Sequence, residues 1–137
     1  YLAHPPACAA GCAGRGRIGV DGLGAGVMDD AAGLRTRLDA AFGQHPHVGD
    51  IRGRGLFIGI ELVADRQTKA AFDPALHIAG KIKTQAMQAG LMCYPAQGTI
   101  DGRQGDHILL APPYIISDDE MDMLVARLQS AVDLALA

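Results

Sequence analysis

Residue types that bind metal ions occur close together at the amino-terminal end of the chain. His4, Cys8 and Cys12 follow one another at intervals of four residues, so a continuous helix would place all three side chains on one face. Imidazole and thiolate groups are common ligands of zinc, which takes four ligands in a structural site. A fourth ligand is not evident in the sequence, and we therefore predict no metal site.

Two further patterns involve groups that bind anions. Arg52 and Arg54 flank Gly53 at a glycine-rich turn and could contact an anion, but we expect them to form ion pairs at a solvent-facing surface or an interface. The run from Gly22 to Gly26 looks like part of a dinucleotide-binding loop. No strand precedes this run and its third glycine is misplaced, so nucleotide binding is not predicted.

The amino-terminal third of the chain is predicted to be helical. Pro5 and Pro6 suit a first helical turn, but four glycines interrupt the alanine-rich stretch that follows. Each glycine costs about 1 kcal/mol relative to alanine, and we expect this helix to fray or break. Asp21 to Gly26 is predicted as a loop. A second helix follows, since apolar residues recur at helical spacing and Gly43 can end it; these residues are Val27, Ala31, Leu34, Leu38, Ala41 and Phe42.

The segment from His45 to Val63 is predicted to join a helix end, a tight turn and a buried strand. Its two histidines flank a proline, and we expect both to be solvated turn residues. Gly53 and Gly55 stand at a bend where a Cβ would be unfavourable. The residues from Leu56 to Val63 are largely apolar, which is typical of a strand that enters a core.

The remaining elements alternate between helix and strand. Asp73 and Pro74 form an N-cap and first-turn pair for a helix that Gly90 ends, and Ser117 with Glu120 forms a capping box for the last helix. Short strands are predicted at residues 91–94 and 107–110, with a loop at 95–106. We therefore predict an α/β (α+β) fold, with a small sheet and helices packed on one face. Residues 1–26 form an inter-domain helix and loop, and residues 27–137 form a small domain.

Composition limits the possible partners and compartments. The chain has 137 residues and a formal net charge of -3, with no block of basic residues, so we predict no nucleic-acid partner. It has neither an apolar run of membrane-spanning length nor a signal pattern, so we predict no membrane association and a cytoplasmic protein. Three cysteines without disulfide-framework spacing suit a reducing compartment. Because the first residue is Tyr1, we treat the chain as a fragment.

Several short runs together resemble one enzyme family. They are Tyr1-Leu-Ala-His-Pro-Pro-Ala-Cys-Ala-Ala10, His45-Pro46 followed by Ile51-Arg-Gly-Arg-Gly-Leu56, Gly90-Leu-Met-Cys-Tyr-Pro95 and Ala111-Pro-Pro113. In this order they resemble the carboxyl-terminal domain of class III pyridoxal-phosphate aminotransferases of fold-type I. Two positions depart from the family pattern. Ala3 stands where glycine is usual, and Pro6 stands where an apolar side chain is usual.

The resemblance implies a cofactor that this chain does not itself bind. Pyridoxal phosphate needs a lysine, an acidic residue beside its pyridine nitrogen and donors around its phosphate. In the family the lysine lies well upstream of this segment, and the phosphate-binding threonine would fall just before Tyr1. We expect the three lysines present to be solvated; they are Lys69, Lys81 and Lys83.

The resemblance places Tyr1 and Leu109 at the substrate pocket. Family members of the ornithine type have an arginine two residues before the Ala-Pro-Pro turn, where its planar fork holds an α-carboxylate. Leu109 occupies that position. This substitution implies an amine or ω-amino acid substrate, or a carboxylate held by a residue outside this chain. The alternative interpretation is that Leu109 is simply a core strand residue.

The function implied by the resemblance is therefore that of a fragment. The complete enzyme would be a homodimer that transfers an amino group from an amine donor to a keto-acid acceptor, and the isolated chain would be inactive. A free-standing small α/β binding or interaction module without a cofactor is the alternative, and a decayed gene remnant is a third hypothesis. A cooperative melt and a monodisperse chain would favour the free-standing module.

Overall fold

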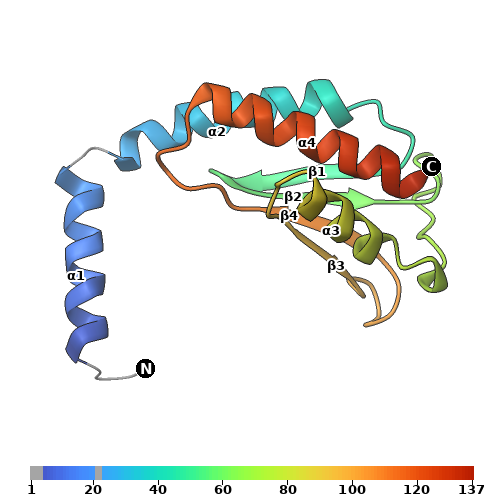
Figure 1. The fold of residues 1–137 in the computed structure, drawn as a ribbon, viewed down its shortest axis with the longest axis horizontal. Helices are drawn as coiled ribbons and strands as arrows, with labels where there is room; N and C mark the ends of the chain where they lie inside the picture. The colour runs from blue at the N-terminus through green and yellow to red at the C-terminus, as the bar shows by residue number, and fades with distance from the viewer. Residues whose placement is uncertain (1–4, 21–22) are drawn as a thin grey trace.

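The computed structural model describes residues 5–20 and 23–137. In chain order the elements are α1 (Pro5–Val20), α2 (Leu23–Phe42), β1 (Val48–Arg54), β2 (Phe57–Leu62), the 3-10 helix η1 (Pro74–Leu76), α3 (Ile78–Gln88), β3 (Tyr94–Gln97), β4 (Asp106–Leu110) and α4 (Asp118–Leu136) (Figure 1). Among these residues, no helix is both long enough and apolar enough to span a membrane.

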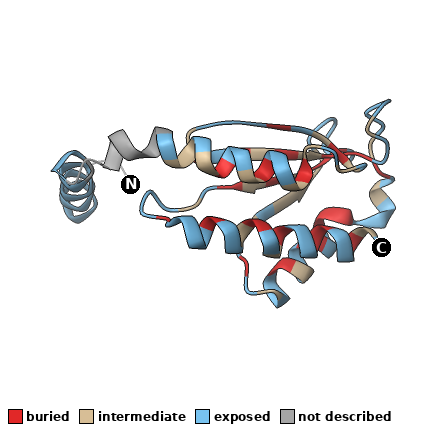
Figure 2. Cartoon of the chain, turned by 90° about the horizontal axis from the view of Figure 1, so that it is seen from above, coloured by how far each residue is buried: buried red, intermediate tan, exposed pale blue. Residues whose placement is uncertain are grey.

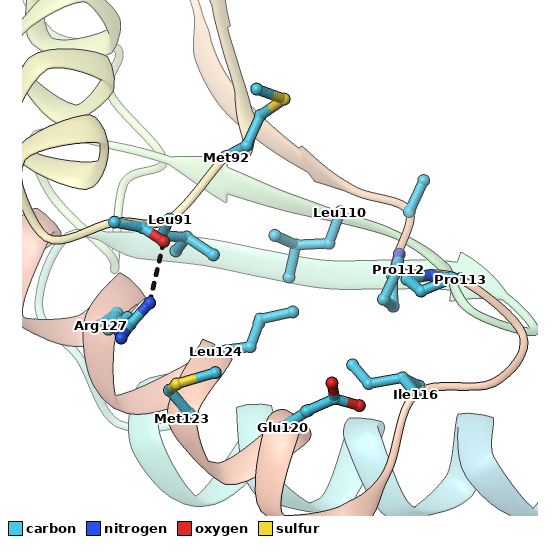
Figure 3. A pocket seen from close by; sticks show the side chains of 12 residues that line it. Leu91, Met92, Leu110, Pro112, Pro113, Ile116, Glu120, Met123, Leu124 and Arg127 are labelled. Atoms are coloured by element: carbon cyan, nitrogen blue, oxygen red, sulfur yellow. Dashed lines mark hydrogen bonds between the residues drawn. The ribbon is translucent and has the colours of Figure 1, made fainter.

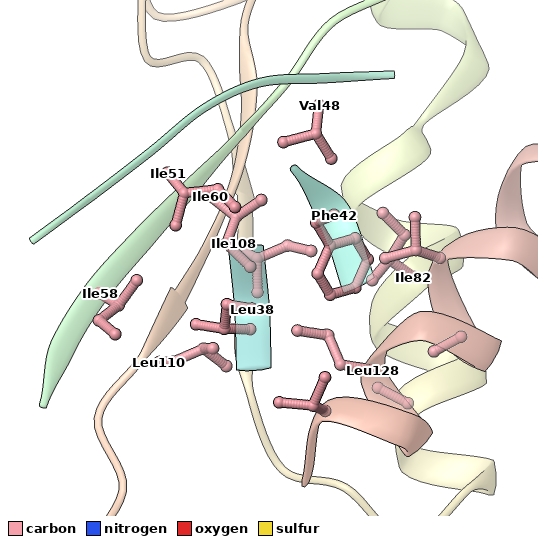
Figure 4. Packing of buried hydrophobic residues seen from close by; sticks show 14 of the residues in the cluster. Leu38, Phe42, Val48, Ile51, Ile58, Ile60, Ile82, Ile108, Leu110 and Leu128 are labelled. Atoms are coloured by element: carbon pink, nitrogen blue, oxygen red, sulfur yellow. The ribbon is translucent and has the colours of Figure 1, made fainter. Parts of the chain in front are cut away.

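The strands form one antiparallel sheet in the order β1-β2-β4-β3, and helices α2, α3 and α4 pack on one of its faces (Figure 1). The prediction of a small sheet with helices on one face is confirmed. Side chains from both layers form a single hydrophobic core between them (Figure 4). Its largest fully buried members include Leu34, Leu38, Phe42, Ile60, Ile82, Ile108 and Leu128.

A hairpin joins β1 and β2 in the middle of the chain. Gly55 adopts a left-handed backbone with φ of 58°, which favours glycine. A Cβ at Gly53 would lie 2.2 Å from the carbonyl oxygen of Phe57, so the close approach of the strands excludes a side chain there. The predicted strand at 56–63 is confirmed as β2. Strand β1 was not predicted, because its glycines and charged residues hide the alternation that marks a strand.

Strand β3 lies later in the sequence than expected. The predicted strand at 91–94 overlaps β3 only at Tyr94, and the predicted loop at 95–106 contains the rest of β3. Strand β3 contains Pro95, and it tolerates a proline because it is an edge strand. Leu91 instead contributes its side chain to the core. The strand predicted at 107–110 is confirmed as β4.

The two amino-terminal helices are longer than predicted. Helix α1 runs without a break through its four glycines, so the predicted fraying or break is wrong. Its alanines have the highest helix propensity, which offsets part of the glycine cost. All its described side chains are exposed (Figure 2). Helix α2 already includes Leu23 to Gly26, so the predicted loop is wrong there, while residues 21 and 22 lie outside the described residues. The division at 26/27 remains a prediction.

The two carboxyl-terminal helices have different caps. Asp73 caps η1, and His77, with a left-handed φ of 49°, separates η1 from α3. Helix α3 therefore starts later than predicted. Its first turn is capped from β4, since the Asp106 carboxylate accepts a hydrogen bond from Ala79 N–H at 3.2 Å. The predicted capping box at the start of α4 is confirmed.

Candidate functional site

The sheet face opposite the helices, here called the open face, carries Leu109. On β4, Ile108 and Leu110 point into the core, so Leu109 points to the other side, where it is half-buried. It is therefore not part of the helix-covered core. Tyr1, the other predicted pocket residue, lies outside the described residues.

Leu109 belongs to a row of residues that crosses the whole sheet. It is paired with Tyr94 on β3 and with Gly59 on β2, and Gly59 is paired with Arg52 on β1. A Cβ at Gly59 would lie 3.5 Å from Leu109 Cδ2, so the leucine side chain lies beside the bare backbone of β2. The Tyr94 side chain next to it is 66% exposed. The part of the row formed by Tyr94, Leu109 and Gly59 is apolar, and Arg52 stands at its β1 end.

A small ion-pair network occupies one side of the open face. Arg52 Nη1 lies 3.0 Å from Asp50 Oδ2 and 3.1 Å from Glu61 Oε2. The hydrogen bond from Arg52 is the largest factor that lowers the pKa of Asp50, and the bonds to Asp50 and then Glu61 raise the pKa of Arg52. The predicted ion pairing of Arg52 is thus confirmed. With two carboxylates around one guanidinium, the network does not attract a further carboxylate.

His107 also lies on the open face, two residues before Leu109 on β4. Its Nδ1 atom is 2.7 Å from Thr99 Oγ1, and the Thr99 hydroxyl lies 3.2 Å from the carbonyl oxygen of Gly105. These bonds fasten the loop between β3 and β4 to the edge of the open face. The sequence alone did not mark Tyr94, Gly59 or His107 as site residues. Their positions beside Leu109 follow from the register of β2, β3 and β4, which local periodicity does not specify.

His45 and His47 are half-buried parts of the structure rather than solvated turn residues, so that prediction is wrong. His47 N–H donates to His45 Nδ1 at 3.1 Å, which leaves the His45 proton on Nε2, 3.3 Å from Asp133 Oδ1. His47 Nδ1 lies 3.2 Å from the carbonyl oxygen of Val63 and therefore donates to it. The two imidazoles thus join the end of α2 to β2 and α4.

The three lysines and the two cysteines of the candidate metal-binding pattern lie at the surface. Lys69, Lys81 and Lys83 are all exposed, as predicted, and Lys69 donates a hydrogen bond to the carbonyl of Gly49. Within residues 5–20 and 23–137, no three histidine, cysteine or acidic side chains are placed to hold a metal ion. Cys8 and Cys12 are exposed, and His4 lies outside the described residues.

An apolar pocket of about 290 Å³ opens at the other side of the sheet, between the first turns of α4 and the end of β4 (Figure 3). Its lining is mainly aliphatic and includes the predicted Ala-Pro-Pro turn. The lining residues are Gly90, Leu91, Met92, Leu110, Ala111, Pro112, Pro113, Ile116, Glu120, Met123, Leu124 and Arg127. This pocket is separate from the open face, since Leu110 points toward the helices.

The chain matches the model of the aminotransferase class-III family over residues 1–132. It is 41% identical over 137 residues to an uncharacterized aminotransferase from Schizosaccharomyces pombe, covering 100% of this chain and 30% of that protein. The structure resembles an (S)-enantioselective omega-transaminase from Thermomicrobium roseum, with a TM-score of 0.84 and 27% identity over 98% of this chain and 28% of the other. It also resembles a PMP-bound aminotransferase from Vibrio fluvialis, with a TM-score of 0.73 and 28% identity over 85% of this chain and 24% of the other.

The chain belongs to the class III aminotransferase family. The family resemblance and the fold inferred from the sequence are both confirmed. The chain spans less than a third of the length of each of these three relatives.

Proposed function

We propose that this chain is the small-domain part of a pyridoxal-phosphate-dependent transaminase. The complete enzyme transfers an amino group from an amine or ω-amino acid to a keto acid, and it works as a homodimer in the cytoplasm. Family membership and the short coverage of the relatives support this proposal. The 137-residue chain alone is inactive, because its three lysines are exposed and it spans less than a third of the length of these relatives.

The observation that carries the proposal is the position of Leu109. It lies on the open face, in a row with Tyr94 and Gly59, and so presents an apolar surface away from the core. We propose that this face closes one side of the substrate pocket in the complete enzyme. A leucine cannot form the bidentate contact that an arginine gives a carboxylate. This end of the pocket therefore accepts an apolar part of the substrate.

Tyr1 is proposed to lie at the substrate pocket as well, next to the segment that joins the small domain to the cofactor-binding part. When bound to the complete enzyme, pyridoxal phosphate supplies the electron-withdrawing ring that transamination requires. This chain supplies the wall of the pocket, with the sheet that holds Leu109 in place.

A chimera tests this proposal. The matching segment of the Thermomicrobium roseum omega-transaminase would be replaced by this chain, and the transaminase activity of the purified chimera would be measured with an amine donor and with ornithine. We expect activity with the amine, and we expect Leu109→Arg to shift the ratio of kcat/KM values toward ornithine by about tenfold or more, since a bidentate ion pair is gained.

The control variant is Tyr114→Arg, an exposed position in the segment that joins β4 to α4. This variant should leave the substrate ratio unchanged. A folded, cofactor-loaded chimera that is inactive with every amine would contradict the proposed function. An active chimera whose substrate ratio does not respond at Leu109 would contradict the assignment of the open face to the substrate pocket.

A further inference from the structure

The loop between β3 and β4, residues 98–105, contains an aspartate followed directly by a glycine, Asp101 and Gly102 (Figure 1). Aspartate rearranges most readily before glycine, because glycine has no Cβ to shield its backbone nitrogen. The other Asp–Gly pair of the sequence, Asp21–Gly22, lies outside the described residues. By sequence, Asp101 is therefore the described residue most prone to this reaction.

The rearrangement has two chemical steps. In the first, the backbone nitrogen of Gly102 attacks Cγ of Asp101, a C–N bond forms, and the carboxyl OH leaves with the N–H proton as water. The product is a five-membered succinimide ring. In the second step, water adds to one ring carbonyl and breaks its bond to nitrogen, which gives either aspartate or isoaspartate. The first step needs a free Gly102 N–H and a protonated Asp101 carboxyl group.

The folded loop engages the attacking nitrogen. Gly102 N–H donates a hydrogen bond to the carbonyl of Gly98 at 3.0 Å. The two glycines lie so close that a Cβ on Gly98 would be 2.9 Å from the carbonyl carbon of Gly102. Gly98 N–H in turn donates to the carbonyl of Gly105 at 2.8 Å, which closes the base of the loop. Attack by the Gly102 nitrogen therefore requires its hydrogen bond to Gly98 to break.

The loop also holds the carboxylate of Asp101. Its Oδ1 atom accepts hydrogen bonds from the N–H groups of Gln104 and Arg103, at 2.6 and 2.9 Å. The bond from Gln104 and then that from Arg103 lower the pKa of Asp101, so its carboxyl group is ionised at neutral pH. An ionised carboxylate does not release an oxygen to the attacking nitrogen. Hydrogen bonds within the loop thus restrain both reacting groups.

We propose that Asp101 is a site of isoaspartate formation, which the closed loop between β3 and β4 prevents and an open loop allows. The rate then follows the fraction of molecules in which the loop is open. Isoaspartate places an extra methylene in the backbone and moves the carboxylate away from the N–H groups of Arg103 and Gln104. The modified loop therefore cannot close as before. This inference goes beyond the proposed function and does not depend on it.

Two side chains fasten the loop to its surroundings. Thr99 Oγ1 lies 2.7 Å from Nδ1 of His107 on β4. Gln97 Nε2 donates to the carbonyls of Pro74 and Arg103, at 3.2 and 3.0 Å. Thr99→Val removes the contact with His107 but keeps a β-branched side chain of similar size. This variant should therefore open the loop more often and speed the reaction at Asp101.

A comparison of the folded with the unfolded chain tests the proposal. The chain would be incubated at neutral pH, folded in buffer or unfolded in guanidinium chloride, and isoaspartate would be followed by mass analysis of tryptic peptides. Trypsin releases the two Asp–Gly pairs in separate peptides, residues 18–35 and 84–103. We expect isoaspartate at Asp101 to form at least about tenfold more slowly in the folded chain. Equal rates, or no isoaspartate at Asp101 in the unfolded chain, would overturn the proposal.

Thr99→Val tests the part played by the loop, and Thr84→Val is its matched control. Thr84 is exposed on α3, where its hydroxyl donates to the carbonyl of Gly80. We expect isoaspartate at Asp101 to form several-fold faster in Thr99→Val than in the wild type, and at the wild-type rate in Thr84→Val. Equal rates in the two folded variants would contradict protection by the closed loop. If far-UV circular dichroism shows Thr99→Val to be unfolded, the comparison of folded with unfolded wild type still decides.

Discussion

The two faces of the sheet are made of the same strands but have different contacts. The face toward α2, α3 and α4 is covered by a continuous hydrophobic core, while the open face carries Leu109, Tyr94, His107 and an ion-pair network. Side chains that alternate along one strand thus belong to different environments. Stability resides mainly on the covered face, and we propose that the open face contacts the substrate.

The largest effect is expected from two adjacent residues of β4. Ile108→Ala removes a fully buried side chain and should lower the free energy of unfolding by about 2–5 kcal/mol. Leu109→Ala, on the open face, should cost about 1 kcal/mol or less. Urea denaturation of the two variants measures this difference. If both variants lost the same free energy of unfolding, the open face would contribute as much to stability as the covered face.

Two glycines, one on each face of the sheet, provide a second comparison of the covered face with the open face. Gly53→Ala places a Cβ against the backbone of Phe57 and should destabilise the hairpin by about 1–3 kcal/mol. Gly59→Ala meets Leu109 only at an ordinary contact distance of 3.5 Å and should be tolerated. Thermal unfolding of the two variants tests this order. A Gly59→Ala variant less stable than Gly53→Ala would contradict the backbone register.

The carboxyl group of Asp106 on the covered face is expected to make the free energy of unfolding depend on pH. Burial raises the pKa of its carboxyl above the usual range, and the hydrogen bond from Ala79 N–H opposes this only in part. The native state therefore holds the proton more tightly than the unfolded state. Asp106 contributes most to stability below its unfolded pKa, and this contribution is lost as pH rises through the raised native pKa.

Two substitutions separate the charge of Asp106 from its hydrogen bond. Asp106→Asn keeps an oxygen acceptor but cannot ionise. Its free energy of unfolding should therefore not fall as pH rises through the native pKa of the wild-type carboxyl. Asp106→Ala leaves Ala79 N–H without its partner and should cost about 1–3 kcal/mol at every pH. Denaturation from pH 4 to 8 provides the measurement. An asparagine variant with the wild-type pH dependence would refute the assignment.

The smallest effect is expected at the exposed ion-pair network. Arg52→Gln breaks both bonds to Asp50 and Glu61, yet the free energy of unfolding should fall by no more than about 1 kcal/mol, because solvent screens these charges. The loss should shrink further at high salt. A fall in the free energy of unfolding as large as that of Ile108→Ala would contradict this expectation and would mean that the ion pairs are a main source of the sheet's stability.

The sequence predicted the covered face better than the open face. Helical spacing identified the buried stripe of α2, and the capping box identified where α4 begins. Strand β1 was not predicted because Gly49 and Gly53 stand where its pattern needs apolar residues. Strand β3 was predicted too early in the sequence, and its Pro95 is tolerated because β3 is an edge strand. Leu109 was identified through the family resemblance, whereas its neighbours Tyr94 and Gly59 depend on strand register, which local periodicity does not specify.

We propose that this chain forms a wall of a transaminase pocket but does not hold the cofactor. The most direct test of this proposal is titration of the isolated chain with pyridoxal phosphate, followed by borohydride reduction and mass analysis. We predict weak labelling spread over Lys69, Lys81 and Lys83, because all three are exposed. A single lysine modified stoichiometrically, with a saturable visible absorbance, would contradict the claim.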